Sequence, residues 1–158
     1  MVSGRMLQIM PLIIWSAWSL NFFAAVFIIL MVRCMKQSHP DCKILPDAPD
    51  CWDDDKRNET ALFAMTLLGA GEILGGTIIG WVRDKTGNRI AIISEILLLL
   101  IGFAFVIVLN AQNKFGPFAY VMTFMWGIQD SGLNCLINCI LGFEFDSKIA
   151  PFGVYKFS

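Results

Sequence analysis

A short charged turn between two long apolar segments constrains the fold of this chain more than any other feature. The stretch 69–91 reads GAGEILGGTIIGWVRDKTGNRIA, with apolar residues toward both of its ends. Its centre carries four charged residues and a glycine within seven positions, namely Arg83, Asp84, Lys85, Gly87 and Arg89. Because the connection is so short, the two apolar segments must form an antiparallel helical hairpin.

The composition of the 158-residue chain is that of a membrane protein. Hydrophobic residues make up 56% and charged residues 16% of it, whereas a soluble domain averages about 45–50% apolar and about 25% charged residues. The apolar residues stand in long unbroken blocks, which favours membrane spans over a soluble core. The first block is too long for the core of a signal peptide and is not followed by a small-residue cleavage site. The net charge of −1 gives no indication of a nucleic-acid partner.

Four apolar blocks are long enough to cross a bilayer as helices, since about twenty helical residues cover roughly 30 Å. We predict an all-α membrane protein with a single domain over residues 1–158. Its four transmembrane helices are expected over residues 7–32, 60–82, 90–109 and 117–143. In the first of them, Ser16, Ser19 and Asn21 are mildly polar. We expect these side chains to form hydrogen bonds between helices rather than to contact a solute.

The predicted loop 33–59 contains three cysteines, Cys34, Cys42 and Cys51. In an oxidising compartment they favour one disulfide with one thiol left over, and the sequence does not decide the pairing. With His39 they have the spacing C-x4-H-x2-C-x8-C, which fits no common zinc site, so we expect no metal there. Asn58 begins an Asn-Glu-Thr sequon and is a candidate N-glycosylation site at the membrane edge.

Glycines and one acid mark the second predicted span. Two G-x-x-x-G motifs, whose spacing lets two membrane helices approach closely, begin at Gly71 and Gly76. Helical counting places Glu72 on the face that Gly76 and Gly80 share, so we expect this acid in a glycine seam rather than toward lipid. An acid within a span is costly and marks a buried or functional position. Two roles stay open for Glu72, a protonated structural acid and a site for a cation or a proton.

The fourth predicted span is the most polar. Asp130, Asn134 and Asn138 recur every four residues and therefore lie on one helical stripe. Contact with lipid would be strongly unfavourable for these groups, so we expect the stripe to face the interior of a bundle or a wet cavity. Cys135 and Cys139 in the same span are explained as small packing residues without a metal.

The charged turn carries a family resemblance. Residues 80–89, GWVRDKTGNR, resemble the signature loop of the major facilitator superfamily, G-x-x-x-D-[RK]-x-G-[RK]-[RK], although Asn88 stands where the family prefers a second base. Residues 125–134, MWGIQDSGLN, followed by LGFEF at 141–145, resemble the tenth helix of the Unc-ninety-three-like branch, which carries G-x-x-D-S-x-x-N. The resemblance implies that the chain corresponds to helices seven to ten, part of the second half-bundle of such a transporter.

The resemblance also implies a gate at the turn. Asp84 would accept hydrogen bonds at the start of the third helix, while Lys85 and Arg89 would reach carboxylates on neighbouring helices. Glu95, near the start of the third span, is expected to join this charge network rather than to bind a ligand. Glycines would allow the turn and the close approach of the helices. The implied gating residues are Gly80, Asp84, Lys85, Gly87 and Arg89.

The orientation in the membrane rests on the same resemblance. The twelve basic residues divide equally between the two sides of the predicted topology, so the positive-inside rule alone does not decide it. The signature loop of the family is cytoplasmic. We therefore expect the turn inside and the cysteine-containing loop 33–59 outside the cytoplasm, in a multi-pass protein of the plasma membrane or an endomembrane.

The resemblance implies a secondary transporter of a cation or a small polar solute. Its path would be lined by Glu72, Asp130, Asn134 and Asn138. Because alternating access needs two halves, we expect a partial form of a longer transporter, or a bundle that a second chain completes within the lipid bilayer. The alternative is a non-transporting membrane adaptor that regulates an ion channel or a receptor. The sequence contains no Ser/His/Asp set, metal pattern or phosphate-binding loop, so we expect neither an enzyme nor a cofactor.

Overall fold

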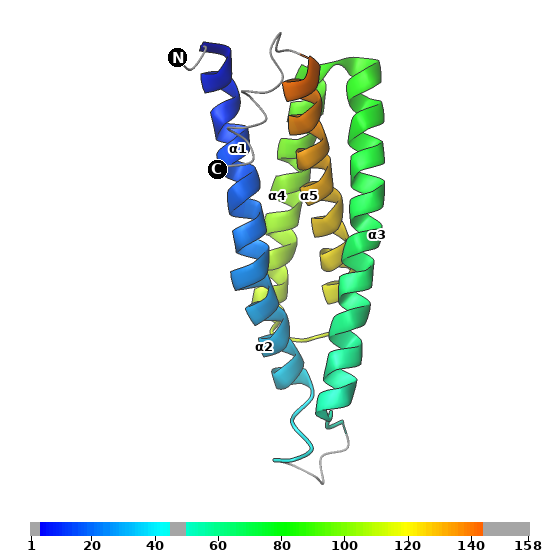
Figure 1. Ribbon diagram of the computed structural model, residues 1–158. Helices are drawn as coiled ribbons and strands as arrows, with labels where there is room; N and C mark the ends of the chain where they lie inside the picture. Colours follow the sequence, from blue (N-terminus) through cyan, green and yellow to red (C-terminus); the bar gives the residue numbers. More distant parts are fainter. Residues whose placement is uncertain (1–3, 45–49, 144–158) are drawn as a thin grey trace.

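The computed structural model describes residues 4–44 and 50–143, which form an all-helical bundle (Figure 1). The described ranges contain no strand, and an isolated β-bridge joins Asp41 to Trp52. The first segment is helical from Gly4 to Ser38, with one π-helical stretch inside it. The elements are α1 (Gly4–Phe22), η1 (Phe23–Phe27), α2 (Ile28–Ser38), α3 (Asp54–Thr86), α4 (Asn88–Gln112) and α5 (Pro117–Phe143).

Local sequence signals account for where these helices begin and end. The carboxylate of Asp53 accepts a hydrogen bond from the backbone N–H of Lys56 (2.9 Å) and caps the start of α3. A single residue, Gly87, separates α3 from α4, and its φ of 85° is a conformation that glycine adopts without strain. The left-handed Asn113 (φ 49°) ends α4, and Pro117 begins α5. The charged turn is thus a one-residue connection within a helical hairpin.

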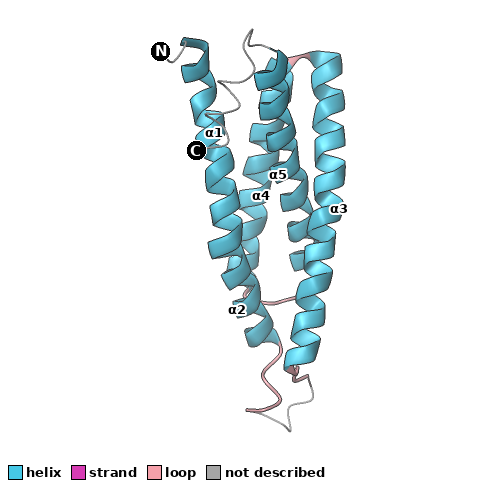
Figure 2. Cartoon of the chain, in the orientation of Figure 1, coloured by secondary structure: helices cyan, strands magenta, loops and turns pink. Residues whose placement is uncertain are grey.

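The helices run side by side, with the α3–α4 turn at one end and residues 39–44 and 50–53 at the other (Figure 2). Helix α5 is the centre of the bundle, because it contacts α1, α3 and α4. The first residues of α1 lie at the same end as the α3–α4 turn (Figure 1). Two buried clusters form the core, one around Ile13, Ile79 and Leu133 and the other around Phe27, Leu109 and Met122.

The tightest contact of the bundle is between the backbones of α3 and α5. A Cβ at Gly71 would overlap the carbonyl oxygen of Phe124, and a Cβ at Gly75 would overlap that of Ile128. From the other side, a Cβ at Gly127 would overlap the carbonyl oxygen of Leu68. These three glycines interlock, so that main chain packs on main chain, as in membrane helix pairs of the small-x-x-x-small type.

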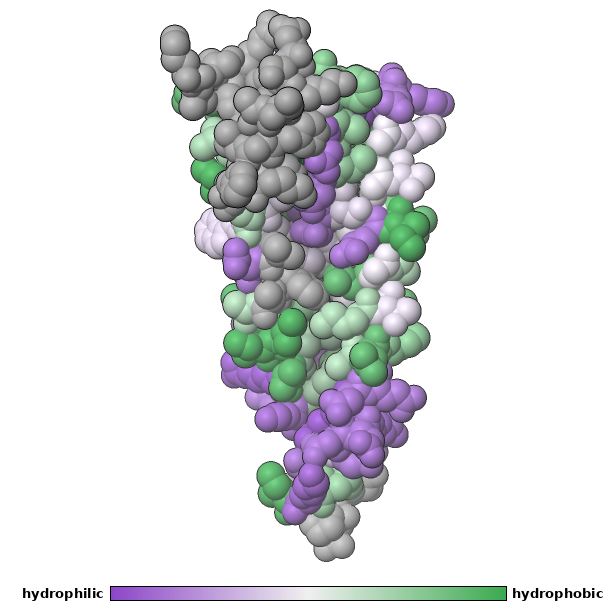
Figure 3. Space-filling model, in the orientation of Figure 1, coloured by the Kyte–Doolittle hydropathy of each residue, from purple (hydrophilic) through white to green (hydrophobic). Residues whose placement is uncertain are grey.

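Two helices, α3 and α4, are long and apolar enough to cross a membrane, judged by length and composition. This indicates membrane association, because most residues of both helices lie on the surface of the bundle. Hydrophilic side chains gather near the end that carries residues 39–53 and at the α3–α4 turn (Figure 3). Hydrophobic and weakly polar side chains cover much of the face between these ends.

Replacing Gly75→Ala tests the α3–α5 contact. The new methyl group would collide with the backbone of Ile128, and overpacking of this kind costs about 1–3 kcal/mol. We expect the free energy of unfolding in lipid bicelles to fall by that amount. Gly69→Ala is the matched control, because nothing lies within 4 Å of its Cβ position, and it should leave stability unchanged or raised. Equal effects of the two substitutions would contradict this packing.

Candidate functional site

A line of polar side chains lies between α1 and α5. The hydroxyl of Ser19 donates a hydrogen bond to Oδ1 of Asp130 (3.2 Å), and the hydroxyl of Ser16 donates to Oδ1 of Asn134 (3.1 Å). The amide of Asn134 in turn donates to the main-chain oxygen of Asp130 (2.9 Å) and lies 3.4 Å from its Oδ2. Asp130 and Asn134, two of the three residues of the predicted stripe, therefore face α1. Each accepts a hydrogen bond from a serine, and the two serines are one helical turn apart.

Asn138, the third member of the stripe, is exposed, so it does not join Asp130 and Asn134 in the contact with α1. Of the two surroundings expected for the stripe, the interior of the bundle does not apply to Asn138. Glu72 is exposed as well, although we expected it within a glycine seam. The buried glycines of α3, Gly71 and Gly75, pack on the main chain of α5, whereas Gly76 and Gly80 are half-buried and lie near α5 side chains. Helical counting groups Glu72 with Gly76 and Gly80, but it gives only relative angles. It could not show that Gly71 and Gly75 are the glycines that pack on the main chain of α5.

Three aromatic rings pack together at the end of this line of polar side chains that is nearer to residues 39–44 and 50–53. Trp126, one turn before Asp130, is fully buried and stacks on Phe22 with ring centres 5.1 Å apart. Phe103 of α4 contacts the rings of Phe22 (5.7 Å) and Trp126 (6.1 Å) edge-on. Toward the α3–α4 turn, the polar positions of α5 continue instead to the exposed Asn138.

Glu95 lies inside the bundle and not in the charge network of the turn, which corrects our expectation. Only 3% of the residue is exposed, and its carboxylate lies against Gly132 of α5. Helix α4 begins at Asn88, so Glu95 is two turns inside it and on the same face as the buried Ala91 and Gly102. Asp130 is close enough to Glu95 and to Glu72 to interact electrostatically with both.

The residues of the turn make other contacts than those implied by the resemblance. Asp84 is exposed in the last turn of α3 and does not cap α4, whose start has no side-chain cap. The one-residue connection explains this, since Asp84 is still part of the preceding helix. The ammonium of Lys85 lies 4.5 Å from the ring centre of Trp81. Among the described residues, neither Lys85 nor Arg89 forms an ion pair with a carboxylate.

Sequence reasoning missed Arg83 as the organising residue of the turn. Its Nε donates a hydrogen bond to Oδ1 of Asn88 (2.9 Å), which bridges the last turn of α3 and the first turn of α4. The guanidinium lies 4.8 Å from the ring centre of Phe143 at the end of α5. The one departure from the family pattern, Asn88, was a usable signal, because an amide here pairs with Arg83 where a second base would repel it.

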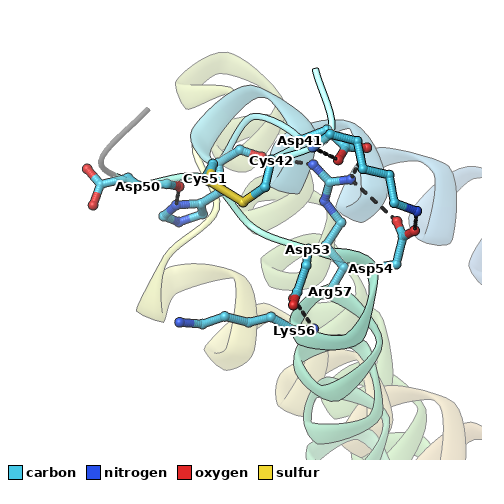
Figure 4. The surroundings of a disulfide bond; sticks show 10 residues. Asp41, Cys42, Asp50, Cys51, Asp53, Asp54, Lys56 and Arg57 are labelled. Carbon is cyan, nitrogen blue, oxygen red and sulfur yellow. Dashed lines mark hydrogen bonds and ion pairs between the residues drawn. A yellow bond between two sulfur atoms is a disulfide. The ribbon is translucent and has the colours of Figure 1, made fainter. Parts of the chain in front are cut away.

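The cysteine-containing segment is joined by a disulfide between Cys42 and Cys51, and Cys34 is a buried free thiol in α2 (Figure 4). Arg57 joins this segment to the start of α3 by hydrogen bonds. Its guanidinium donates to Oδ2 of Asp41 (3.1 Å) and to the main-chain oxygen of His39 (3.2 Å). The ring of His39 stacks on that of Trp52 with ring centres 3.8 Å apart. The sequon residue Asn58 is exposed in the first turns of α3 rather than in the loop.

Hydrogen bonds outside the predicted spans shift two ionisable groups. The backbone N–H of Lys43 donates to Asp41 and, with Arg57, lowers the pKa of the Asp41 carboxyl. The ammonium of Lys43 pairs with Asp54 at 2.5 Å, and this hydrogen bond raises the pKa of Lys43. Both shifts favour the ionised forms, so the charges hold the disulfide segment against the start of α3 (Figure 4).

The described part of the chain brings several polar side chains together between α1 and α5. No cluster of three or more metal-ligating side chains occurs within residues 4–44 and 50–143. Cys135 and Cys139 are partly buried free thiols. What the bundle does bring together is Asp130, Asn134 and two serine hydroxyls, with a second acid, Glu95, close by. Such a set can hold a proton or hydrogen-bond a small cationic or polar group.

A double-mutant cycle tests the α1–α5 hydrogen bonds. Ser19→Ala and Asp130→Ala each remove one partner of the hydrogen bond, and their effects on the free energy of unfolding in bicelles should be coupled. Hydrogen bonds between membrane helices couple by about 0.6 kcal/mol on average and at most about 1.7 kcal/mol. Ser94→Ala paired with Asp130→Ala is the control, because the Ser94 hydroxyl bonds within its own helix. Strict additivity for Ser19 and Asp130 would contradict the contact.

The acid titration of Asp41 tests the geometry of the disulfide segment. Because the pKa of Asp41 is lowered in the folded chain, its contribution to stability is present above the pKa of the unfolded chain. It is lost as the pH falls through the folded value. NMR of the carboxyl carbon in micelles should give a midpoint below the ordinary range for aspartate, and Arg57→Gln should raise it. A midpoint at or above that range would show that the N–H of Lys43 and Arg57 do not hold this carboxylate.

No known family model, curated protein or solved structure matches the chain. The fold described above therefore rests on the contacts of this chain alone.

Proposed function

We propose that this chain is a four-span membrane protein of the major facilitator type, and that it moves a cation or a small polar solute along the polar line between α1 and α5. One observation carries this proposal. Asp130 and Asn134 are turned inward onto Ser19 and Ser16 of a facing helix. Ionisable and amide groups within apolar helices are expensive and mark substrate or ion pathways in membrane proteins.

The exposed surface supports insertion into lipid. Only 22% of the most apolar window of α3, and 22% of that of α4, is buried inside the bundle. The core helix of a soluble protein would hide most of its apolar residues. Large apolar side chains such as Ile73, Leu100 and Ile107 are instead at least 60% exposed. A bilayer would cover this surface at no cost, whereas water would not.

The ends of the polar line fit a gated path. The aromatic layer of Phe22, Phe103 and Trp126 blocks it toward the disulfide segment. At the opposite end of the bundle, Arg83 bridges α3 and α4 through Asn88 and reaches Phe143 of α5. Movement of α3 and α4 relative to α5 would have to break the contact with Phe143. We therefore propose Arg83, in place of Asp84, as the gating residue that the resemblance to the signature loop implies.

A second candidate function is favoured by one observation, the exposure of Glu72 and Asn138 on the bundle surface. Polar groups of membrane helices face protein or water rather than lipid. A further helix packed over Glu72 and Asn138 would satisfy them. That helix could come from the rest of a longer transporter or from a channel or receptor subunit. In the second case the chain would be a non-transporting adaptor.

Ion flux into liposomes tests the proposed function. Purified chain is reconstituted with a dye sensitive to sodium, potassium or protons, and each gradient is imposed in turn. We expect flux of at least one ion. Asp130→Asn should lower its rate to about a tenth or less, which is a loss of about 1.4 kcal/mol. Thr66→Ala is the control, because this exposed hydroxyl bonds to the oxygen of Leu62 in its own helix.

Two results would reject the transport role. The first is an unchanged rate for Asp130→Asn in a chain that conducts. The second is no flux of any ion by the wild-type chain, together with a stoichiometric membrane partner that co-purifies with it. That partner would establish the adaptor function, and its loss on Glu72→Leu or Asn138→Leu would place it on the exposed polar surface.

A further inference from the structure

Glu95 is a buried acid without a partner. The residue is 97% buried, and neither Oε1 nor Oε2 has a hydrogen-bond partner in the part of the chain that the structure describes. An ionised carboxylate in such surroundings would lose its hydration and gain nothing in return. A neutral carboxylic acid avoids most of that loss. The surroundings of Glu95 therefore favour the protonated form.

Helix α5 has a slot for this acid. A Cβ at Gly132 would overlap Oε1 of Glu95 and would lie 3.2 Å from its Cδ. The side chain of Ile79, on α3, borders the same space at 2.9 Å from that Cβ position. Any residue other than glycine at position 132 would thus displace the carboxyl group. Three helices meet at this point, and the carboxyl group of Glu95 fills the space beside Gly132.

The charged and titratable groups around Glu95 are few. From α5, Asp130 and Cys135 interact with it electrostatically. From α3, Ile79 is uncharged, and Arg83 acts on Cys135 rather than on Glu95. From α1, the groups next to Asp130 are the neutral hydroxyls of Ser16 and Ser19. No described cation therefore compensates a negative charge on Glu95.

Asp130 and Glu95 compete for one negative charge, because two neighbouring carboxylates in a low-dielectric interior do not both ionise readily. Burial disfavours a charge on either acid. Asp130 accepts a hydrogen bond from Ser19, and the amide of Asn134 lies 3.4 Å from its second oxygen, whereas Glu95 has neither donor. Of the two acids, Asp130 is therefore the better placed to hold a charge and Glu95 the better placed to hold a proton.

We propose that Glu95 is a proton-binding site of the bundle, which carries its proton at neutral pH and releases it to water when α4 and α5 separate. Release breaks the O–H bond of the carboxyl group and leaves a carboxylate in a hydrated space. A metal cation is the poorer occupant, since no group of three or more metal-ligating side chains occurs within the residues that the structure describes. That this proton is the coupling ion rests on the proposed transport function, whereas its binding does not.

Infrared difference spectroscopy of the whole chain in lipid membranes, between neutral and alkaline pH, tests the site. The wild-type chain should show the carbonyl stretch of a protonated carboxyl group at neutral pH. Glu95→Gln, which keeps size and shape, should remove that band. Glu59→Gln, which replaces an exposed glutamate at the start of α3, should leave it unchanged. A band that survives Glu95→Gln, or that disappears in Asp130→Asn instead, would overturn the proposal.

Circular dichroism shows whether Glu95→Gln folds. If it does not, two further variants test the proposal. Glu95→Asp keeps the acid one methylene shorter, and Gly132→Ala narrows the slot; each should shift the band. An unchanged band in both would overturn the proposal. The flux assay separates the two claims. A Glu95 band in a chain without flux rejects transport alone, and flux without a Glu95 band rejects the proton site alone.

Discussion

The backbones of α3 and α5 touch at three interlocked glycines, and the arrangement of the other helices depends on this contact. A methyl group at Gly71 or Gly75 of α3, or at Gly127 of α5, would overlap a carbonyl oxygen of the facing helix. The contact with α3 occupies one face of α5. The face that carries Asp130 and Asn134 is thereby turned toward α1, where two serines provide hydroxyl groups. Packing of small residues thus decides where the polar groups can lie.

The same packing produces two acids in contrasting surroundings. Asp130 has a hydroxyl donor and a nearby amide, so its charge is supported within the bundle. Glu95 reaches α5 through the space that Gly132 leaves open and finds no donor in the described residues. Membrane proteins retain such groups despite their cost chiefly where protons or solutes pass. This contrast connects the glycine pattern to the proposed transport.

Sequence alone predicted the helical segments and the hairpin, because apolar block length and the Gly87 turn are local properties. It also predicted that Asp130 and Asn134 share an inward face. It failed for Glu72, since a helical wheel gives relative angles but not the direction of the neighbouring helix. Glu95 was assigned to the turn by its nearness in sequence, yet two helical turns carry it into the bundle. The capping role expected for Asp84 failed because one residue connects α3 to α4.

A cysteine cross-link between α1 and α5 tests most directly the claim that the polar side of α5 is hidden against α1 in the membrane. Cysteines are introduced by Ser16→Cys and Asn134→Cys, in a background where the free thiols Cys34, Cys135 and Cys139 are replaced by alanine. Oxidation of the chain in native membranes should give an intramolecular disulfide between positions 16 and 134. Absence of that cross-link, with position 134 labelled instead by a lipid-soluble thiol reagent, would contradict the account.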